Sequence, residues 1–162
     1  MTATDSATET RPRARARARV DLVRPWPQGM EAMRAFSGAV REASLDPILA
    51  NLMKQRASQL NGCAYCLDMH AKESRAVGED QQRLDVLAAW REVDLFTDRE
   101  RAALALTEAI TLVADGHVPD EVIDAAREHF DDREVAELVF AVVVINAWNR
   151  IAITARTPLP PA

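Results

Sequence analysis

The stretch REVAELVFAVVVINAWNRIAITA, residues 133–155, decides the fold class. Its middle is apolar nearly all round, which is typical of a helix at the centre of a core. Asp131 or Asp132 precedes it as an N-cap, and the three prolines of residues 157–162 cannot continue it. We therefore expect one long, central helix over residues 133–155.

Glycines, prolines and capping residues divide the rest of the chain into lengths typical of helices. Asp46-Pro47 predicts a helix start, Gly78 a helix end, and Thr97-Asp98-Arg99-Glu100 a capping box. The expected helices before the central one cover, approximately, residues 30–40, 47–60, 62–77, 80–91, 98–116 and 119–130. Very little of the chain resembles a strand, so the sequence predicts an all-α fold, a compact bundle of about six to seven helices.

The chain has 162 residues, of which 48% are hydrophobic and 28% charged, values that suit one globular domain. Its first residues differ, because they include no aromatic residue, leucine or isoleucine and carry arginine at every second position from Arg11 to Arg19. We expect a disordered, Arg-rich tail over residues 1–19 and a single all-helical domain over residues 20–162.

Charge and composition exclude several classes of partner. The tail carries +3, residues 20–162 carry −8, and an acidic domain of this kind argues against nucleic acid as a partner. The longest apolar run, Leu138 to Ile145, has eight residues against the roughly 18–20 that cross a bilayer, so we expect no membrane partner. Two cysteines are too few for a secreted disulfide framework and no signal peptide is evident, so the expected compartment is the cytoplasm.

The two cysteines stand three residues apart, a spacing that calls for a chemical reason. On a helix, Cys63, Cys66 and His70 fall within about 60° of one another and share one face. Cys63 stands in the first turn, where free amides and the helix dipole favour a thiolate, the nucleophilic form of cysteine. His70 can accept or return the proton of a thiol, and Glu73 can orient the imidazole.

Two other interpretations of the pair stay open. The cysteines could be inert core residues, since cysteine is among the most buried residue types. With His70 they could also supply three zinc ligands, the fourth being His117, His129 or a group of a neighbouring subunit, although structural zinc usually takes its ligands from two separated pairs. Both of these last histidines stand near helix ends, where a cation favours a capping role. A thioredoxin-like site is excluded, because that motif needs a βαβ setting.

Polar and aromatic residues of the later helices have structural interpretations. Asn146, Asn149 and Arg150 interrupt the otherwise apolar central helix, and buried polar groups need partners. We expect them to form a hydrogen-bond network between helices or across subunits. Trp90 and Trp148 lie among apolar helical positions and are expected in the core.

The stretch RASQLNGCAYCLDMH, residues 56–70, resembles the core motif of the alkylhydroperoxidase AhpD-like proteins of the carboxymuconolactone decarboxylase family. Similarity continues through AAWRE (88–92), FTDRE (96–100) and INAWNR (145–150), and so covers roughly residues 29–158. The resemblance implies an all-helical fold that assembles as trimers or hexamers, and a peroxide- or disulfide-reducing chemistry without metal or other cofactor. It places the cysteine pair on Cys63 and Cys66 and the relay histidine on His70. Cys66 would attack the peroxide and Cys63 would resolve the product.

One position departs from the family pattern. Members commonly carry a proton-accepting glutamate twelve residues before the first cysteine, where this chain has Asn51, and Gln55 replaces a usual apolar residue on the same helix. Asparagine can form hydrogen bonds but cannot take a proton, so either Glu73 or another carboxylate compensates, or activity is weak. Tyr65, inside the pair, is expected to be a pocket wall or a core contact, because its ordinary pKa is near 10.

Three functions follow from these observations. The leading hypothesis is a thiol-dependent peroxidase or disulfide reductase in antioxidant defence, whose partners are a peroxide substrate, an external dithiol reductant and copies of the same chain. The second is a lactone decarboxylase, which the family name suggests but which needs no cysteine pair. The third is a redox sensor or oligomeric binding module without efficient turnover, which Asn51 favours.

Overall fold

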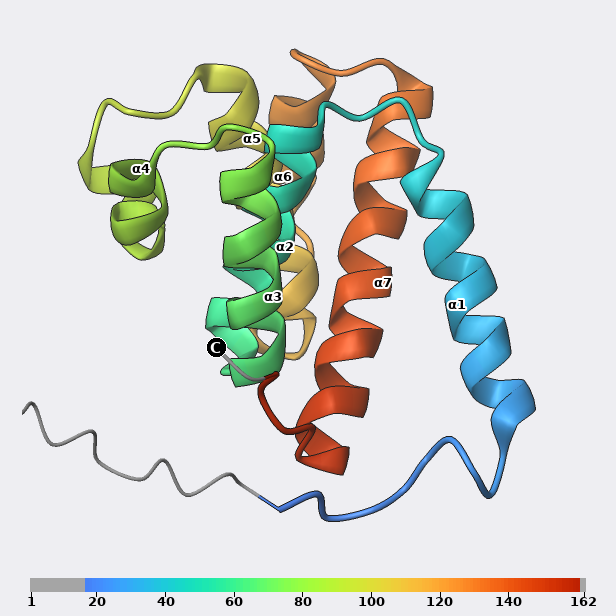
Figure 1. Ribbon diagram of the computed structural model, residues 1–162. Helices are drawn as coiled ribbons and strands as arrows, with labels where there is room; N and C mark the ends of the chain where they lie inside the picture. Colours follow the sequence, from blue (N-terminus) through green and yellow to red (C-terminus); the bar gives the residue numbers. More distant parts are fainter. Residues whose placement is uncertain (1–16, 161–162) are drawn as a thin grey trace, which may run out of the picture.

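The computed structural model describes residues 17–160 and shows seven α-helices and two 3₁₀-helices in that range, with no strand (Figure 1). This confirms the all-α prediction. The elements, in chain order, are α1 Pro27–Arg41, α2 Pro47–Asn61, α3 Ala64–Ala76, α4 Gln81–Val86, η1 Leu87–Glu92, α5 Asp98–Thr111, η2 Val113–Asp115, α6 Asp120–Arg127 and α7 Asp132–Ala155.

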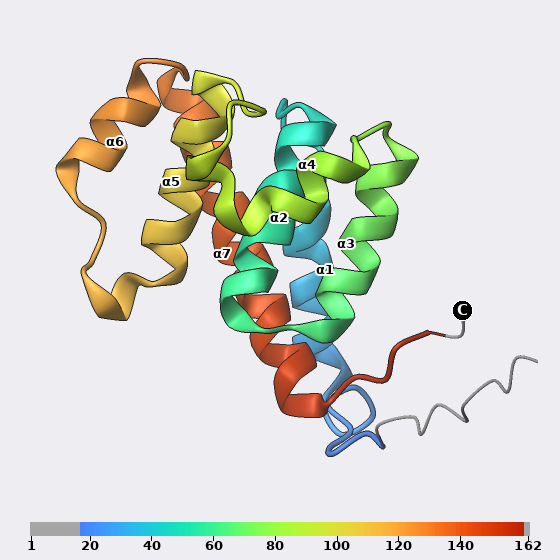
Figure 2. The ribbon, with the colours of Figure 1, turned by 90° about the vertical axis from the view of Figure 1, so that its left-hand side faces the viewer.

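Helices α2 and α7 form the middle of the bundle (Figures 1 and 2). Helix α2 packs against α3, α5 and α7, and α7 packs in addition against α1 and α5. Helix α6 lies against α5, on the side of the molecule away from α3 (Figure 2). The two central helices therefore each have one face toward α5 and α6 and another toward α1 and α3.

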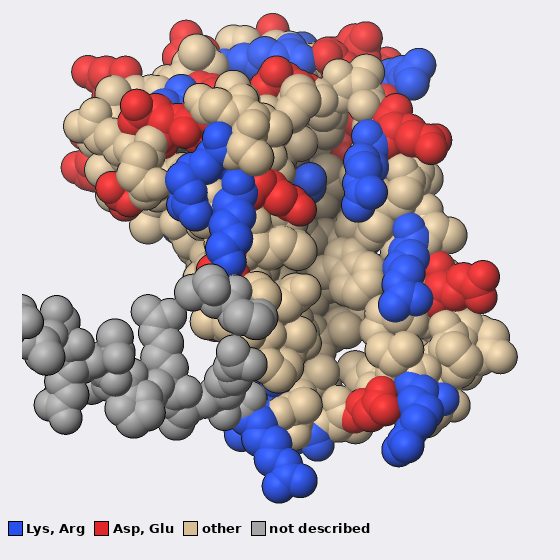
Figure 3. All heavy atoms as spheres, viewed as in Figure 1, with Lys and Arg blue, Asp and Glu red and all other residues tan. Residues whose placement is uncertain are grey.

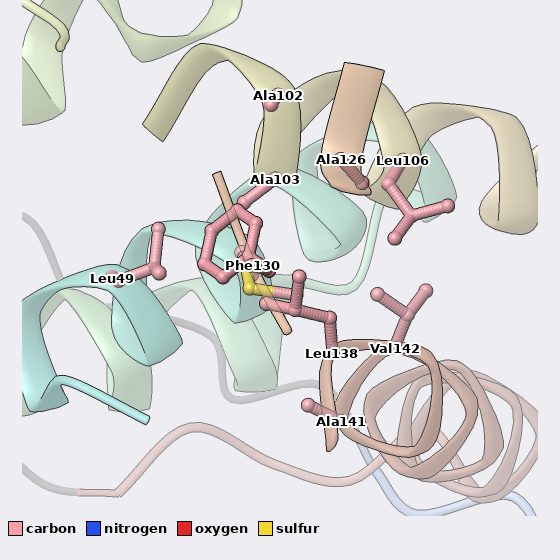
Figure 4. Close-up of a cluster of buried hydrophobic side chains, with 10 residues drawn as sticks. Leu49, Ala102, Ala103, Leu106, Ala126, Phe130, Leu138, Ala141 and Val142 are labelled. Atoms are coloured by element: carbon pink, nitrogen blue, oxygen red, sulfur yellow. The ribbon is translucent and has the colours of Figure 1, made fainter. Parts of the chain in front are cut away.

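The buried face toward α5 and α6 is an apolar core, shown in Figure 4. Leu49 of α2, Phe130 after α6 and Leu138 of α7 point toward one another there, and each is at most 4% exposed. The other members of this core are Met53, Ala102, Ala103, Leu106, Ala126, Ala141 and Val142. The central helix over residues 133–155 is thus confirmed at the place that its apolar sequence predicts.

Helix α7 is also long and apolar enough, by length and composition alone, to cross a membrane. Core helices meet the same test, and α7 buries Leu138 and Val142 in the apolar core. The absence of a membrane partner stays a prediction. Assembly into trimers or hexamers also stays a prediction. The exposed apolar side chains Phe140 and Val143 of α7, at 53% and 40%, agree with it.

Local capping residues set several helix boundaries as expected. The Asp46 carboxylate accepts a hydrogen bond from the Leu49 amide at 3.0 Å and so caps α2. Thr97 and Asp131 each form a complete capping box, at the starts of α5 and α7. Gly78, which follows α3, has a φ of +90°, a left-handed conformation that favours glycine.

The prediction of a single helix over residues 80–91 is wrong. The structure has the short helix α4, then the 3₁₀-helix η1, with a break at Ala89 (φ −116°, ψ 30°). The guanidinium of Arg101, on α5, donates hydrogen bonds to the carbonyl groups of Trp90, Arg91 and Val93 at 3.1–3.3 Å. The Arg101 side chain thus supplies hydrogen bonds to carbonyl groups at the end of η1, which have no partner within the helix.

Four further boundaries differ by a few residues. Helix α1 begins at Pro27, α3 begins at Ala64, α5 ends at Thr111, and α6 ends at Arg127. At the other end of the chain, residues 1–16 of the predicted tail lie outside the described residues. Of the predicted tail, the structure describes residues 17–19, and there the Arg19 amide donates a hydrogen bond to the carbonyl oxygen of Ala155 at 2.8 Å.

Candidate active site

A glycine turn places the cysteine pair. Gly62 ends α2 with a φ of +67°, and the chain then reverses so that Cys63 becomes the N-cap of α3. The Cys63 sulfur accepts a hydrogen bond from the Cys66 amide at 3.4 Å. The two sulfur atoms lie 2.6 Å apart, and each cysteine is only 1% exposed. Both are free thiols, packed against Ala57, Ile145 and Ala152.

Burial decides the acidity of Cys66. Burial, the largest cause, and the neighbouring Cys63 together raise the pKa of this thiol to about 12, while a hydrogen bond from Asn149 acts in the opposite direction. At Cys66, burial thus outweighs the stabilisation of a thiolate that the start of a helix provides. The thiol needs a base before it can act as a nucleophile.

His70 stands one turn after Cys66 on α3. It is 5% exposed, and its Nδ1 lies 2.8 Å from Oε2 of Glu73. This hydrogen bond is the main reason why the pKa of Glu73 lies below its ordinary value. Since Nδ1 carries the proton in that contact, the lone pair of the neutral ring is on Nε2. Among the described residues, Nε2 has no hydrogen-bond partner.

A cavity of about 990 Å³ opens between α1, α2, α3 and α7. The hollow is visible in Figure 3, in the same orientation as Figure 1. Among the residues that sequence reasoning selected, those that line it are Cys66, His70, Glu73, Asn51 and Tyr65. Cys63 does not line the cavity and lies behind Cys66. The structure therefore gathers all six predicted residues at one place, with Tyr65 as a wall.

Sequence reasoning missed three cations in this cavity. Arg34 and Arg41 of α1 line it, as does Lys54 of α2, whose Nζ lies 3.5 Å from Oδ1 of Asn51. The one available signal was the spacing of Asn51 and Lys54, which puts both on one face of α2. Trp148, expected in the core, also lines the cavity and donates a hydrogen bond to the Ser37 hydroxyl at 2.5 Å.

An amide network joins the end of α2 to α7, as the polar residues of α7 predict. The Asn61 amide donates to Oδ1 of Asn146 at 2.9 Å and to Oδ1 of Asn149 at 2.8 Å. The Asn149 amide donates to the Ser58 hydroxyl at 3.1 Å, and Arg150 donates to Oδ1 of Asn146 at 2.9 Å. Because Asn61 directly precedes the glycine turn, the network fixes the point from which the cysteine pair begins.

The remaining histidines lie elsewhere. His117 is exposed just after η2, and His129 follows α6; neither lines the cavity. Within residues 17–160, no three side chains of His, Cys, Asp or Glu are arranged to hold a metal ion. The zinc ligand set considered from the sequence therefore does not come together in the described part of the chain.

Known proteins share this sequence pattern. The profile of the carboxymuconolactone decarboxylase family matches residues 27–109. The uncharacterized protein YdfG of Bacillus subtilis is 42% identical over 135 residues, which cover 83% of this chain and 92% of YdfG. The uncharacterized protein YnjA of Escherichia coli is 30% identical over 114 residues, which cover 68% of this chain and 60% of YnjA.

Solved structures share the fold. A protein of unknown function from Agrobacterium tumefaciens, provisionally assigned to AhpD-type antioxidant defence, has a TM-score of 0.87 at 36% identity, over 90% of this chain and 100% of that one. The debrominase Bmp8 has a TM-score of 0.76 at 16% identity, over 85% of this chain and 74% of that one. The second likeness concerns the fold alone.

The helical bundle and the cysteine pair at the start of α3 define an AhpD-like protein. The profile match and the identity to YdfG make the assignment firm: the chain belongs to the carboxymuconolactone decarboxylase family. The resemblance noted for residues 56–70 is confirmed at this level.

Proposed function

We propose that the chain is a thiol-dependent peroxidase in which Cys66 attacks the peroxide, Cys63 resolves the product and His70 is the base. The observation that carries this proposal is the order of the groups from the cavity inward. Cys66 and His70 line the cavity, and the Cys63 sulfur lies 2.6 Å behind that of Cys66. A peroxide in the cavity therefore meets Cys66 first. The antioxidant assignment of the Agrobacterium relative supports the same chemistry.

The first step is proton transfer followed by attack. Nε2 of His70 removes the proton of Cys66, whose raised pKa otherwise keeps it a thiol. The thiolate attacks one oxygen of the peroxide and the O–O bond breaks. The leaving alkoxide takes the proton from the imidazolium and departs as an alcohol, while Cys66 becomes a sulfenic acid. Glu73 holds the ring and stabilises the imidazolium through Nδ1.

The second step forms the disulfide. The Cys63 thiol attacks the sulfur of the Cys66 sulfenic acid, the S–O bond breaks and water leaves. In total, one peroxide and two thiols give one alcohol, one water and one disulfide. An external dithiol then restores both thiols through a mixed disulfide. That dithiol, the symmetric homo-oligomer and the cytoplasmic location are parts of this proposal.

Peroxide consumption by the wild type and by two matched cysteine variants tests the proposal. Without reductant, the wild type should consume one peroxide per chain while its free thiols fall from two to none. Cys66→Ser should consume none over the same time, and Cys63→Ser should consume peroxide without forming an intramolecular disulfide. With dithiothreitol the wild type should turn over many times. Retention of both thiols in peroxide-treated wild type would exclude the mechanism.

A redox sensor is the second candidate, and one observation favours it. Burial raises the pKa of Cys66 to about 12, a value that slows the thiol in the absence of a working base. A sensor would form the disulfide once per chain and would show no multiple turnovers with dithiothreitol. The same assay therefore separates the two candidates.

A further inference from the structure

Three basic side chains line the cavity. Within residues 17–160, Arg34, Arg41 and Lys54 form no ion pair, whereas other arginines pair with carboxylates, as Arg56 does with Glu108. The single acidic residue among the cavity-lining residues, Glu73, is engaged by His70. The cavity therefore carries a positive excess, although residues 20–162 carry a net charge of −8.

Lys54 is the innermost of these charges, since it is half-buried and the two arginines are exposed. Its one polar contact among the described side chains is Oδ1 of Asn51, at the long distance of 3.5 Å. Burial lowers the pKa of the Lys54 ammonium; Glu73 opposes this effect and Arg41 adds to it. A partly buried ammonium without a counter-ion is unfavourable, and a bound anion would supply the missing partner.

The rest of the cavity suits an apolar body. Its walls include Leu45, Met69, Val77, Val144 and Trp148, which come from α3, from α7 and from the segments just before α2 and just after α3. Its volume of about 990 Å³ lies at the upper end of small-molecule sites, which are commonly about 300–1,000 Å³. Figure 3 shows basic side chains along the edges of the hollow and uncharged atoms inside it. These features together match an amphiphile, with an apolar chain and one anionic group.

We infer that the cavity selects an organic hydroperoxide that carries a carboxylate, with Lys54 as the main specificity residue and Arg41 as an auxiliary one. The inference rests on the proposed function, because Cys66 lines the same cavity. The carboxylate pairs with the Lys54 ammonium while the apolar chain lies against the walls. Reduction converts the hydroperoxide to the hydroxy acid and water as the two thiols become a disulfide. Asn51 contributes by being uncharged, since a carboxylate at this position would pair with Lys54.

Binding of unreactive probes tests the inference without any peroxide. We expect octanoate to bind the reduced wild type at least tenfold more tightly than the uncharged 1-octanol, by calorimetry. Lys54→Met should weaken octanoate binding at least tenfold, Lys54→Arg should retain it, and Asn51→Glu should weaken it. Lys72→Met is the matched control, because Lys72 is an exposed lysine outside the cavity, and it should bind octanoate like the wild type.

Lysine signals give a second readout, since the chain has two lysines, Lys54 and Lys72. In protein with ¹³C-dimethylated lysines, octanoate should shift the Lys54 signal and leave the Lys72 signal in place. Equal binding of octanoate and 1-octanol, or unchanged octanoate affinity in a folded Lys54→Met protein, would overturn the inference.

Turnover separates this inference from the proposed function. A fatty-acid hydroperoxide should have a kcat/KM at least tenfold above that of its methyl ester in the wild type, and Lys54→Met should lose this preference. Equal reduction of acid and ester would overturn the carboxylate inference and leave the peroxidase intact. Octanoate binding without reduction of either hydroperoxide would overturn the peroxidase and leave the anion site intact.

Discussion

Helices α2 and α7 each have two buried faces, and these faces are built differently. Toward α5 and α6 they form the apolar core, in which Leu138 and Val142 are fully buried. Toward α1 and α3 they border the cavity, where Nε2 of His70 has no hydrogen-bond partner and Lys54 no ion pair among residues 17–160. The first face consists of packed hydrophobic side chains, whereas the second carries polar and charged side chains that face an open cavity. We infer that stability and chemistry reside in different halves of the same helices.

Removal of a core side chain should give the largest effect. Leu138→Ala deletes a fully buried side chain of the apolar core, which we expect to lower the free energy of unfolding by about 3 kcal/mol. Urea denaturation measures the loss. Val143→Ala, on an exposed position of the same helix, should change it by less than about 0.5 kcal/mol. Loss of peroxide reduction by folded Leu138→Ala protein would contradict the separation of the two faces.

His70→Ala should affect chemistry instead of stability. A positioned base contributes about 10²–10⁴-fold to a proton-transfer step, so we expect the rate of Cys66 oxidation to fall at least tenfold while helical circular dichroism stays unchanged. His117→Ala, an exposed histidine outside the cavity, should react like the wild type.

The pH dependence of the same variant is a sharper test. Because the Cys66 pKa is raised to about 12, the thiol form predominates at neutral pH and the thiolate fraction grows with pH. Without the base, the rate of His70→Ala should rise about tenfold per pH unit between roughly pH 7 and 9. The wild-type rate should rise less steeply. Stopped-flow measurement of thiol loss gives both profiles, and equal slopes would remove His70 from the mechanism.

A helix cap far from the cavity should have a smaller effect on stability alone. Thr97→Ala removes the side chain that caps α5 and should cost about 1 kcal/mol of unfolding free energy. Thr97→Ser retains the hydroxyl and should lose much less. Calorimetric melting measures both variants, and a slower reaction with peroxide in either would show that the two faces are coupled.

Asn51→Glu should have only a small effect on the peroxide reaction. The family pattern suggests that a carboxylate at this position promotes proton transfer, but the nearest cation is Lys54, whose Nζ lies 3.5 Å from the present amide oxygen. The new carboxylate should therefore pair with Lys54, and we expect the rate of Cys66 oxidation by hydrogen peroxide to change less than about threefold. Asn51→Gln is the neutral control. A tenfold rise in Asn51→Glu alone would show that His70 senses position 51.

Features set by neighbours along the chain could be predicted from the sequence. Asp46 and Thr97 each cap a helix through an amide three residues away, and the apolar run of α7 specifies a central position by itself. The break at Ala89 could not be predicted, because no glycine or proline marks it in residues 81–92 and the Arg101 contacts to the segment after it come from another helix.

The candidate site also has a part that could be predicted from the sequence and a part that could not. Cys63, Cys66 and His70 lie within two turns of one helix, so their spacing alone brings them together. Arg41 and Lys54 reach the cavity only because α1 and α2 pack around α3 and α7, which no local pattern encodes. The raised pKa of Cys66 likewise depends on burial by distant residues such as Ile145.

Contact between the two sulfur atoms also decides between two competing reactions of the sulfenic acid in the proposed mechanism. A sulfenic acid on Cys66 either condenses with Cys63 or meets a second peroxide, which leads to the irreversible sulfinic acid. Well-oriented groups in contact can react as though present at roughly 10⁵–10⁸ M, far above any peroxide concentration in solution. With 2.6 Å between the sulfurs, condensation with Cys63 should be faster than oxidation by a second peroxide. The protein should therefore stay active at peroxide concentrations that inactivate an enzyme with a single reactive cysteine.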